Sequence, residues 1–275
     1  MPMSEPTEPS ADESPDSGTE PAANTAEGGA PFGGLLLAIG FLTRIPVGGG
    51  ETAPGALARA MGMFPLVGVL VGGVGAAVYA LANLALPRPA AALLALGATV
   101  LVTGALHEDG LADMADGFGG GADREAKLAI MRDARIGAYG VVALALTLGL
   151  RAVALAGLPG PLSVAGALIA VHALARAAIP VAMQALAPAR ADGLGAGAGR
   201  PSAMQAGIAA TLAILAAALV LPVGAALAAL AGAAIGTVAM VVLAQQQIGG
   251  HTGDVLGATE QLAETFGLLG ALAAA

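Results

Sequence analysis

The chain has 275 residues, of which 57% are hydrophobic and 11% are charged, with a formal net charge of −8 and a mean hydropathy of +0.82. Soluble domains carry charge on about a quarter of their residues, so this composition excludes an ordinary soluble protein and favours an integral membrane protein. The chain has no cysteine, which excludes a disulfide framework and a thiolate metal site.

The acidity of the chain comes from its first 30 residues. They hold seven acids and no lysine or arginine, whereas the remaining residues hold 12 acids and 11 bases, a net charge of −1. Because this segment is rich in Pro, Ser, Glu, Gly and Ala and poor in large apolar side chains, it is predicted to be a disordered acidic tail. It also lacks the basic and apolar regions of a signal peptide. Residues 31–275 are predicted to form one integral membrane domain.

Apolar stretches follow one another after the tail. Residues 32–41 are too short to cross a bilayer, which takes about 20 residues, so they are predicted to be re-entrant or interfacial. Longer apolar runs predict spans at residues 60–86, 90–106, 137–158, 162–186, 206–221 and 223–243. An apolar helix then closes the chain. The predicted fold class is all-α, a polytopic integral membrane helical bundle of about six to eight transmembrane or re-entrant helices.

One long polar insert, residues 107–136, separates the second span from the third. An acidic helix is predicted to stop at Gly117, because the three glycines at 119–121 hold helix poorly. An amphipathic helix then begins with Asp123 as its N-cap and ends near Arg135. Its apolar side chains are predicted to lay it on the bilayer surface; they are Leu128, Met131 and Ile136.

The polar loops all fall on one side of the membrane when the spans are counted alternately. These loops are residues 48–59, 107–136, 188–205 and 245–254. The opposite connections offer only Arg88, whereas the shared side carries most of the basic residues: Arg59, Arg124, Lys127, Arg132, Arg135, Arg190 and Arg200, with Arg44 at its edge. By the positive-inside rule the shared side is cytoplasmic. One site built from several loops is therefore expected there.

Carboxylates crowd the start of the polar insert. Glu108, Asp109, Asp113 and Asp116 fall within nine residues directly after an apolar run, where acids are costly unless they bind something. On a helix, with about 100° per residue, the three aspartates share one face and repel each other unless a cation lies between them. Oxygen ligands of this kind suit Mg²⁺ or Mn²⁺. The alternative interpretation is a solvated polar loop between spans.

Three further polar groups accompany the acidic helix. Arg132 and Arg135 suit phosphate oxygens, although such residues near a membrane also meet anionic lipid headgroups. Thr252 and Asp254 follow a glycine-rich segment, where they either cap a helix or bind a ligand. Arg176 lies four residues after a histidine inside a span, and a buried pairing role and a substrate contact both remain open for it.

Two stretches, HEDGLADMADG at residues 107–117 and IMRDARIG at residues 130–137, resemble the signature of the cobalamin-5'-phosphate synthase family, also called adenosylcobinamide-GDP ribazoletransferases. Four further matches lie in the family's order; they are FLTRIP (41–46), FPLVG (64–68), ARADGLG (189–195) and GHTGDVLGA (250–258). The resemblance covers residues 35–265. Asp192 stands where Glu is expected and Gln261 where some members have Glu, so neither side chain is taken as a catalytic carboxylate.

The resemblance implies a Mg²⁺-dependent phosphotransferase in a bacterial inner membrane, which assembles the nucleotide loop of cobalamin. A ribose hydroxyl of α-ribazole, or of its 5'-phosphate, attacks the phosphate nearest cobinamide in adenosylcobinamide-GDP, and GMP leaves. The lipid bilayer is the other expected partner, no nucleic acid is expected, and the oligomeric state stays open, a homo-oligomer included.

The site residues follow from the motifs and the charged spans. Asp109, Asp113 and Asp116 are the expected metal ligands, and the expected catalytic residues are Asp113, Asp116, Asp133 and Arg132. Asp133 or Asp116 takes the proton of the attacking hydroxyl, while Arg132 and Arg44 neutralise phosphate charge. The expected substrate-binding residues are Arg44, His107, Arg135, Arg176, Arg190, Thr252 and Asp254.

Two other functions compete with this one. The acidic pattern more faintly resembles the CDP-alcohol phosphotransferases, which make lipids by the same type of reaction, but their later aspartates at the matching spacing are missing. A cation transporter is the third hypothesis. Against it, the acids cluster beside one membrane face, and the sequence shows no inverted repeat.

Overall fold

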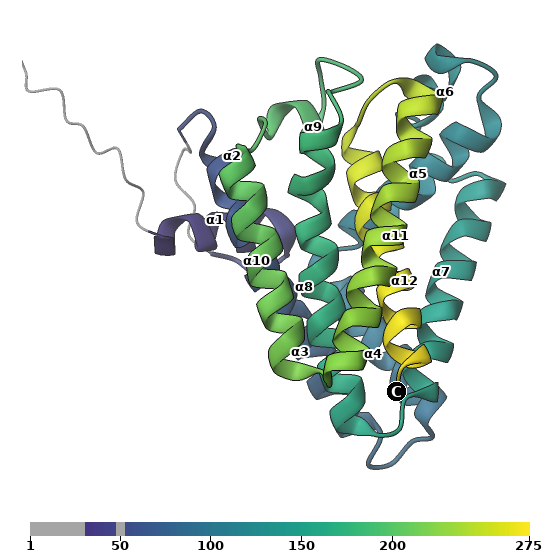
Figure 1. The fold of residues 1–275 in the computed structure, drawn as a ribbon. Coiled ribbons are helices and arrows are strands. Elements are labelled where there is room, and N and C mark those ends of the chain that lie inside the picture. Colours follow the sequence, from purple (N-terminus) through teal and green to yellow (C-terminus); the bar gives the residue numbers. More distant parts are fainter. Residues whose placement is uncertain (1–30, 48–52) are drawn as a thin grey trace, which may run out of the picture.

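Helices form every named element of the part of the chain that this computed structural model describes, which is residues 31–47 and 53–275 (Figure 1). The all-α prediction is confirmed. The predicted acidic tail lies outside the described residues.

Long helices alternate with short ones along the described part of the chain. The first half holds α1 (Pro31–Leu42), α2 (Ala56–Ala60), the 3-10 turn η1 (Met61–Met63), α3 (Phe64–Ala82), α4 (Arg88–Thr103), α5 (Leu106–Gly120) and α6 (Arg124–Ile130). The second half holds α7 (Ala138–Gly157), α8 (Pro161–Ala185), α9 (Leu194–Gly197), α10 (Ala203–Val220), α11 (Val223–Ile248) and α12 (Gly253–Ala273).

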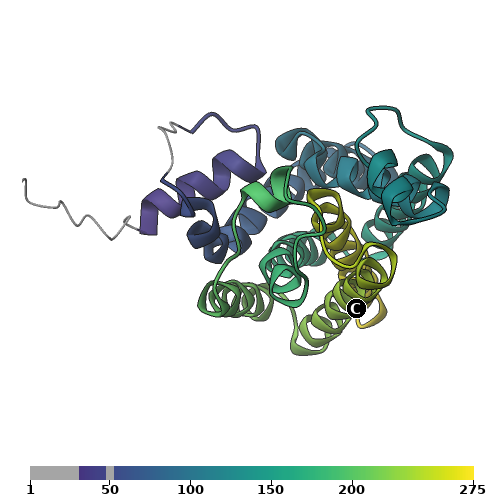
Figure 2. The same cartoon turned by 90° about the horizontal axis from the view of Figure 1, so that it is seen from above.

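Five stretches are long and apolar enough to cross a membrane: α2 to α3 taken together, α7, α8, α10 and α11. The bent pair of α4 and α5 makes a sixth if it is counted as one span. Seen from above, the long helices are viewed nearly end on, with α8 against α3, α10, α11 and α12 (Figure 2). These observations confirm a polytopic membrane bundle.

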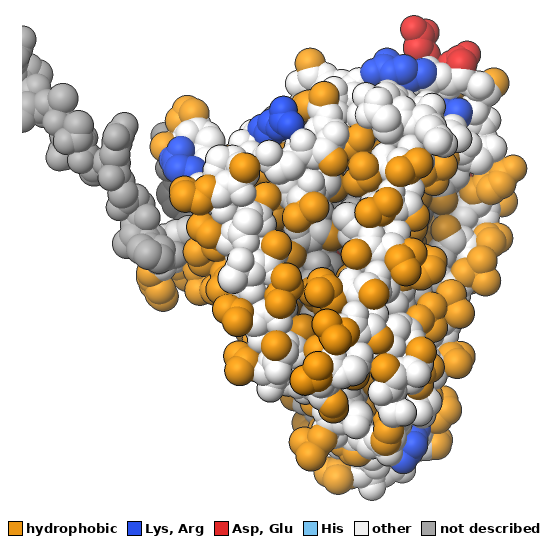
Figure 3. All heavy atoms as spheres, in the orientation of Figure 1, with side chains coloured by type: hydrophobic (Ala, Val, Ile, Leu, Met, Phe, Trp, Pro, Cys, Tyr) orange, Lys and Arg blue, Asp and Glu red, His pale blue; other side chains and the backbone are white. Residues whose placement is uncertain are grey.

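Small side chains hold the bundle together. The largest buried cluster consists mainly of alanines from α4, α8, α10 and α11. In lipid, helices associate by close packing rather than by expelling water, so small interfacial residues suit this environment. Many large apolar side chains point outwards, and Figure 3 shows them along the helices with most of the visible charged side chains at the end that carries α6.

A sharp bend separates α4 from α5. Gly104 and Ala105 both have left-handed backbone angles, with φ of 66° and 59°, and the two helix axes meet at 92°. Ala105 is the one described non-glycine residue with positive φ, a conformation that costs a side chain about 1–2 kcal/mol. The bend turns α5 across the bundle, where it contacts α7 and α12.

The polar insert differs from its prediction in three ways. The acidic helix continues to Gly120, because its glycines let α5 pack closely: a Cβ on Gly119 would lie 2.6 Å from Cγ of Tyr139. Asp123 caps α6 as predicted, accepting a hydrogen bond from the Ala126 amide at 2.9 Å, but α6 ends at Ile130. Leu128 and Met131 are buried among side chains of α5 and α11, so the bilayer-surface prediction is wrong for them.

The polar loops share one end of the bundle, as predicted from the alternation of spans. Figure 1 shows α2, α6 and α9 near that end and the turns that join α3 to α4, α7 to α8 and α10 to α11 at the other. One site assembled from several loops is therefore geometrically feasible.

Candidate active site

A cavity of about 300 Å³ opens where α5, the segment before α9 and the start of α12 meet. Its charged and polar side chains are His107, Asp109, Arg190 and Asp254. A second cavity of about 470 Å³ adjoins it, shares Asp109 with it and is lined by Arg44. The two cavities bring residues from six separate stretches of sequence to one place.

Helices α5 and α12 lie in close contact beside the cavity. A Cβ on Gly110 would lie 3.0 Å from the carbonyl oxygen of Asp254, and one on Gly257 would lie 3.2 Å from that of His107. Any larger side chain at these two positions would push the helices apart. The glycines therefore bring Asp109 on α5 next to Asp254 on α12.

A short backbone bridge brings Arg190 to the same site. The Ala189 amide donates to the His251 carbonyl and the His251 amide donates to the Ala187 carbonyl, both at 2.8 Å. Thr252 caps α12 by accepting from the Val255 amide, and its hydroxyl donates to Asp254 at 3.1 Å. Arg190 then lies 3.5 Å from the Asp254 carboxylate.

Repulsion between carboxylates marks this site. Burial and the neighbouring Asp109, Asp254 and Asp116 raise the pKa of Asp113 to about 6. Neither Asp109 nor Asp113 forms an ion pair or a side-chain hydrogen bond with any described residue. Acids that lie together without basic partners attract a cation, and carboxylate oxygens are the ligands that Mg²⁺ prefers. These carboxylates are therefore candidate ligands for a divalent metal, although the described acids and histidines whose ligand atoms lie close enough together to share one ion are His172, Glu260 and Glu264.

Ion pairs connect the loop of Arg190 to Arg132, which follows α6. Arg132 donates to both oxygens of Asp192 at 2.9 Å, and Arg190 lies 3.7 Å from the same carboxylate. The guanidinium of Arg132 lowers the pKa of Asp192. The Nη1 atom of Arg190 is buried and has no hydrogen-bond partner among the described residues. Arg190 itself lines the cavity, so its guanidinium is placed to bind an anionic oxygen there.

Two of the predicted aspartates make other contacts. Both carboxylate oxygens of Asp116 accept backbone hydrogen bonds, from the Gly137 amide at 2.6 Å and the Gly140 amide at 2.9 Å, and so cap α7. Asp133 pairs with Arg135 at 2.6 Å on the surface, and this hydrogen-bonded arginine lowers the pKa of Asp133 to about 2. Asp133 and Arg135 line neither cavity.

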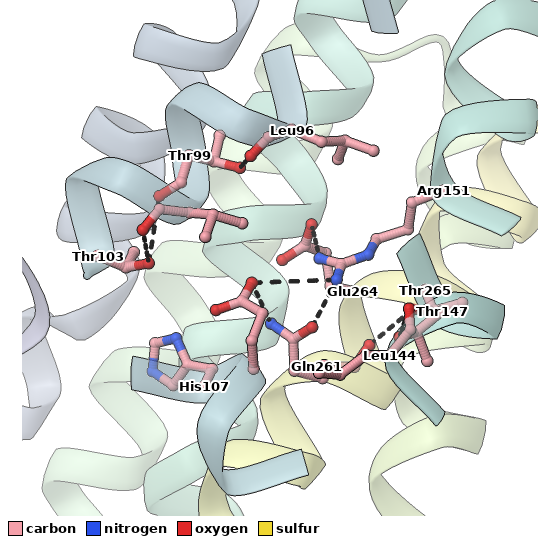
Figure 4. Close-up of polar contacts among 12 residues, drawn as sticks. Leu96, Thr99, Thr103, His107, Leu144, Thr147, Arg151, Gln261, Glu264 and Thr265 are labelled. Atoms are coloured by element: carbon pink, nitrogen blue, oxygen red, sulfur yellow. Dashed lines mark hydrogen bonds and ion pairs between the residues drawn. The ribbon is translucent and has the colours of Figure 1, made fainter. Parts of the chain in front are cut away.

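A second group of charges is buried between α5, α7, α8 and α12. Arg151 donates to Glu264 at 2.8 Å and to Gln261 at 2.5 Å, and it lies 4.0 Å from Glu108 (Figure 4). Gln261 also donates to Glu108 at 3.1 Å. Every member of this group is almost inaccessible to solvent.

Arg176 belongs to this buried group and not to the cavities. It donates to Glu260 at 2.8 Å and contacts the ring of His172, four residues earlier on α8. His172 in turn lies 3.1 Å from Glu264. His107 connects the two regions, since it lines the cavity and lies 3.7 Å from Glu260. Of the two roles left open for Arg176, the structure shows the buried pairing.

The structure thus brings together Arg44, His107, Asp109, Asp113, Arg190, Thr252 and Asp254, and it places Arg132 one contact away through Asp192. The sequence analysis missed the aromatic pair of Phe41 and Phe64, whose ring centroids lie 6.1 Å apart beside the cavity. Their signal was present in the motifs at residues 41–46 and 64–68, but 22 residues separate the two rings in sequence.

The sequence model of the family described as cobalamin-5-phosphate synthase matches residues 34–272. The chain belongs to this family. Curated members are similar throughout: one from Bradyrhizobium diazoefficiens, named adenosylcobinamide-GDP ribazoletransferase, is 50% identical over 87% of this chain and 93% of the relative. Relatives of the same name from Azorhizobium caulinodans and Mesorhizobium japonicum are 48% and 46% identical over 86% of this chain, and 93% and 91% of their own lengths. No solved structure matches the chain significantly.

Proposed function

We propose that this protein transfers the adenosylcobinamide-phosphate part of adenosylcobinamide-GDP to α-ribazole, or to its 5'-phosphate, and releases GMP. Its relatives carry the name of this reaction. The structural observation that supports it is one cavity lined by Asp109, Asp254 and an arginine with an unpartnered nitrogen. Carboxylates that hold a metal and arginines that neutralise phosphate are the groups that phosphoryl transfer uses.

Mg²⁺ is the proposed cofactor, with Asp109, Asp113 and Asp254 as its ligands. These three carboxylates are close enough to repel each other, whereas both oxygens of Asp116 are taken up by backbone amides. When bound, Mg²⁺ supplies a Lewis acid that withdraws charge from phosphoryl oxygens. Asp116 has a structural role instead, because its hydrogen bonds fix the start of α7 against α5.

Arg190 and Arg44 bind the diphosphate of the donor. Arg190 lines the first cavity and Arg44 lines the second, so the two arginines flank Asp109, which lines both. Arginine suits phosphate because its planar group donates two parallel hydrogen bonds. Arg132 contributes by holding Asp192, which keeps the loop of Arg190 in place.

The transfer itself exchanges one phosphorus–oxygen bond for another. A ribose hydroxyl oxygen of the acceptor bonds to the phosphorus that carries cobinamide, and the bond from this phosphorus to the bridging oxygen breaks. GMP leaves with the electron pair of that bond. The hydroxyl proton passes to Asp109 or Asp254, since these are the carboxylates that line the cavity.

The reaction is proposed to occur at the cytoplasmic face of a bacterial inner membrane. Basic residues at the end of the bundle that holds the cavity support this orientation by the positive-inside rule. Because the chain lacks cysteine, Ala191→Cys and Leu162→Cys each introduce a single exposed thiol, one at each end of the bundle. In intact cells an impermeant maleimide should label Leu162→Cys alone; labelling of Ala191→Cys alone would reverse the orientation.

The direct test of function uses purified protein in detergent with adenosylcobinamide-GDP, α-ribazole and Mg²⁺. GMP should appear together with the α-ribazole adduct of adenosylcobinamide phosphate, and a chelator should stop both. Folded protein that releases no GMP under these conditions would refute the proposed reaction. Turnover that persists after the chelator would refute the metal alone.

A further inference from the structure

We propose that the 300 Å³ cavity binds the base of the acceptor nucleoside, an uncharged apolar bicyclic ring, while the donor lies outside it over Arg44. This inference rests on the proposed function and names which of the two substrates enters the cavity.

The cavity also has an apolar wall. Its side chains are Phe41, Met61, Phe64, Ile179, Met183 and Leu256, which come from α1, η1, α3, α8 and α12. Except for Phe41, which packs against its edge, these side chains belong to one buried cluster. The cavity therefore offers apolar side chains to a ring, and carboxylates and an arginine to ribose or phosphate.

The size of the cavity excludes the corrin. A volume of 300 Å³ lies at the lower end of the range of about 300–1,000 Å³ that holds drug-sized ligands. A nucleoside fits such a space, whereas a corrin ring with its amide side chains is several times larger. The cobinamide part of the donor must therefore stay outside.

The chemistry of the apolar wall excludes guanine. The edge of guanine carries several hydrogen-bond donors and acceptors, and side chains such as Phe64, Ile179 and Met183 offer none of the partners that these groups need. Each buried polar group without a partner costs about 1–3 kcal/mol. The dimethylbenzimidazole of α-ribazole has no N–H group once it is joined to ribose. Its one remaining hydrogen-bonding group is a ring nitrogen that accepts, so it can lie against the stacked Phe41 and Phe64 and the methionine sulfurs at a smaller cost than guanine.

The polar wall then receives the sugar. With the base against Phe64 and Met183, the ribose of a nucleoside points towards Asp109 and Asp254, which are the carboxylates that accept the hydroxyl proton. The same arrangement leaves Arg190, which also lines the cavity, beside the reacting phosphate. The geometry thus accounts for an apolar wall beside an acidic one in a single cavity.

The test fills the cavity without touching its charged groups. Ala198 lines it and is buried, whereas its neighbour Gly197 is exposed with nothing within 4 Å of the place of a Cβ. Ala198→Leu should raise the KM for α-ribazole by about tenfold or more, with kcat and the KM for adenosylcobinamide-GDP unchanged. Gly197→Leu is the matched control and should leave all three constants at their wild-type values.

A near-isosteric change tests the chemistry of the wall if Ala198→Leu does not fold. Met183→Gln puts an amide among apolar side chains, so it should weaken binding of α-ribazole several-fold. The difference in affinity between α-ribazole and inosine, whose base has polar edges, should become smaller. Equilibrium dialysis of radiolabelled α-ribazole, without donor, measures this. A rise confined to the KM for adenosylcobinamide-GDP, or unchanged binding of α-ribazole in both variants, would overturn the proposal.

The binding measurement also separates this inference from the proposed function. Wild-type protein that binds α-ribazole, loses it on Ala198→Leu and releases no GMP would keep the cavity assignment and refute the reaction. Wild-type protein that releases GMP, with both variants unaffected towards α-ribazole, would do the reverse.

Discussion

Helices α5 and α12 each carry acids in two different environments, one buried and paired with arginine and one lining a cavity. Glu108 on α5 and Glu260 and Glu264 on α12 are buried, and each lies within 4.0 Å of Arg151 or Arg176. Asp109 and Asp254, on the same helices, line a cavity, and Asp109 has no basic partner among the described residues. Sequence neighbours such as Glu108 and Asp109 thus belong to different regions.

This difference separates the acids that stabilise the fold from those that are proposed to bind a ligand. Buried carboxylates that are paired with arginine and glutamine are already compensated, so removing one partner leaves an uncompensated charge. Burial and the neighbouring carboxylates, among them Asp109 and Asp254 of the cavity, raise the pKa of Asp113, and a cation would relieve the repulsion among them. The first group should therefore govern stability and the second should govern activity.

The largest expected effect is on activity, from Asp113→Asn. This change removes one proposed metal ligand and keeps the side-chain shape, so kcat should fall by about 10³-fold. The unfolding temperature without metal should not fall, because the substitution relieves repulsion among Asp109, Asp113 and Asp254. Turnover by GMP release and thermal unfolding in detergent measure the two quantities. Near-normal turnover would contradict the metal role.

The reverse pattern is expected for Arg151→Leu. Loss of the guanidinium leaves Glu264 and Glu108 without their arginine in the interior, and breaking such a buried group costs about 3–5 kcal/mol. Chemical unfolding in detergent should show this loss, and Arg151→Lys should recover part of it. If Arg151→Leu unfolds like wild type but loses turnover, the buried group serves catalysis and the comparison fails.

Asp116→Asn should lower stability by less than Arg151→Leu does. It also tests whether Asp116 caps α7 or binds the metal. Asn keeps one acceptor for the Gly137 and Gly140 amides, so stability should fall by about 1 kcal/mol, as for the loss of part of a helix cap. The Mg²⁺ concentration for half-maximal turnover should stay at the wild-type value. A large rise in that concentration would restore Asp116 to the metal ligands.

The smallest expected effect is a pH dependence of Mg²⁺ binding. The pKa of Asp113 is raised from its ordinary value to about 6, so below pH 6 this carboxyl holds a proton and binds metal poorly. Mg²⁺ affinity should therefore rise by up to about tenfold per pH unit below pH 6 and level off above pH 7. Without metal the sign reverses: the raised pKa makes the contribution of Asp113 to stability fall as the pH rises from about 4 through 6. Calorimetric titration of Asp113→Asn, which lacks this group, is the control.

The sequence was sufficient for the fold and for the grouping of several candidate site residues. Length and hydropathy predict the spans, and the spacing of Asp109 and Asp113 predicts their common face, because both depend on local periodicity. Asp116 shares that periodicity, yet its carboxylate turns to the amides of α7, which depends on a contact between helices that spacing does not encode.

The other features that the sequence did not predict also depend on contacts between residues far apart in the sequence. The pairing of Arg151 with Glu264 joins residues 113 positions apart, and no local pattern identifies one as the partner of the other. The end of α5 was placed too early because glycine propensity was weighed without the packing of Gly119 against Tyr139. In each case a tertiary contact overrode a local preference.

The bend at Gly104 and Ala105 also sets the depth at which the acids lie. A straight continuation of α4 would carry Glu108 about 30 Å and Asp113 about 38 Å along the axis from Arg88, to or beyond the far edge of a bilayer core that is about 30 Å thick. By turning the backbone through 92°, the bend lays α5 against α7 and α12 instead. The acids therefore stay within the helical bundle, where Asp109 can line one cavity together with Asp254.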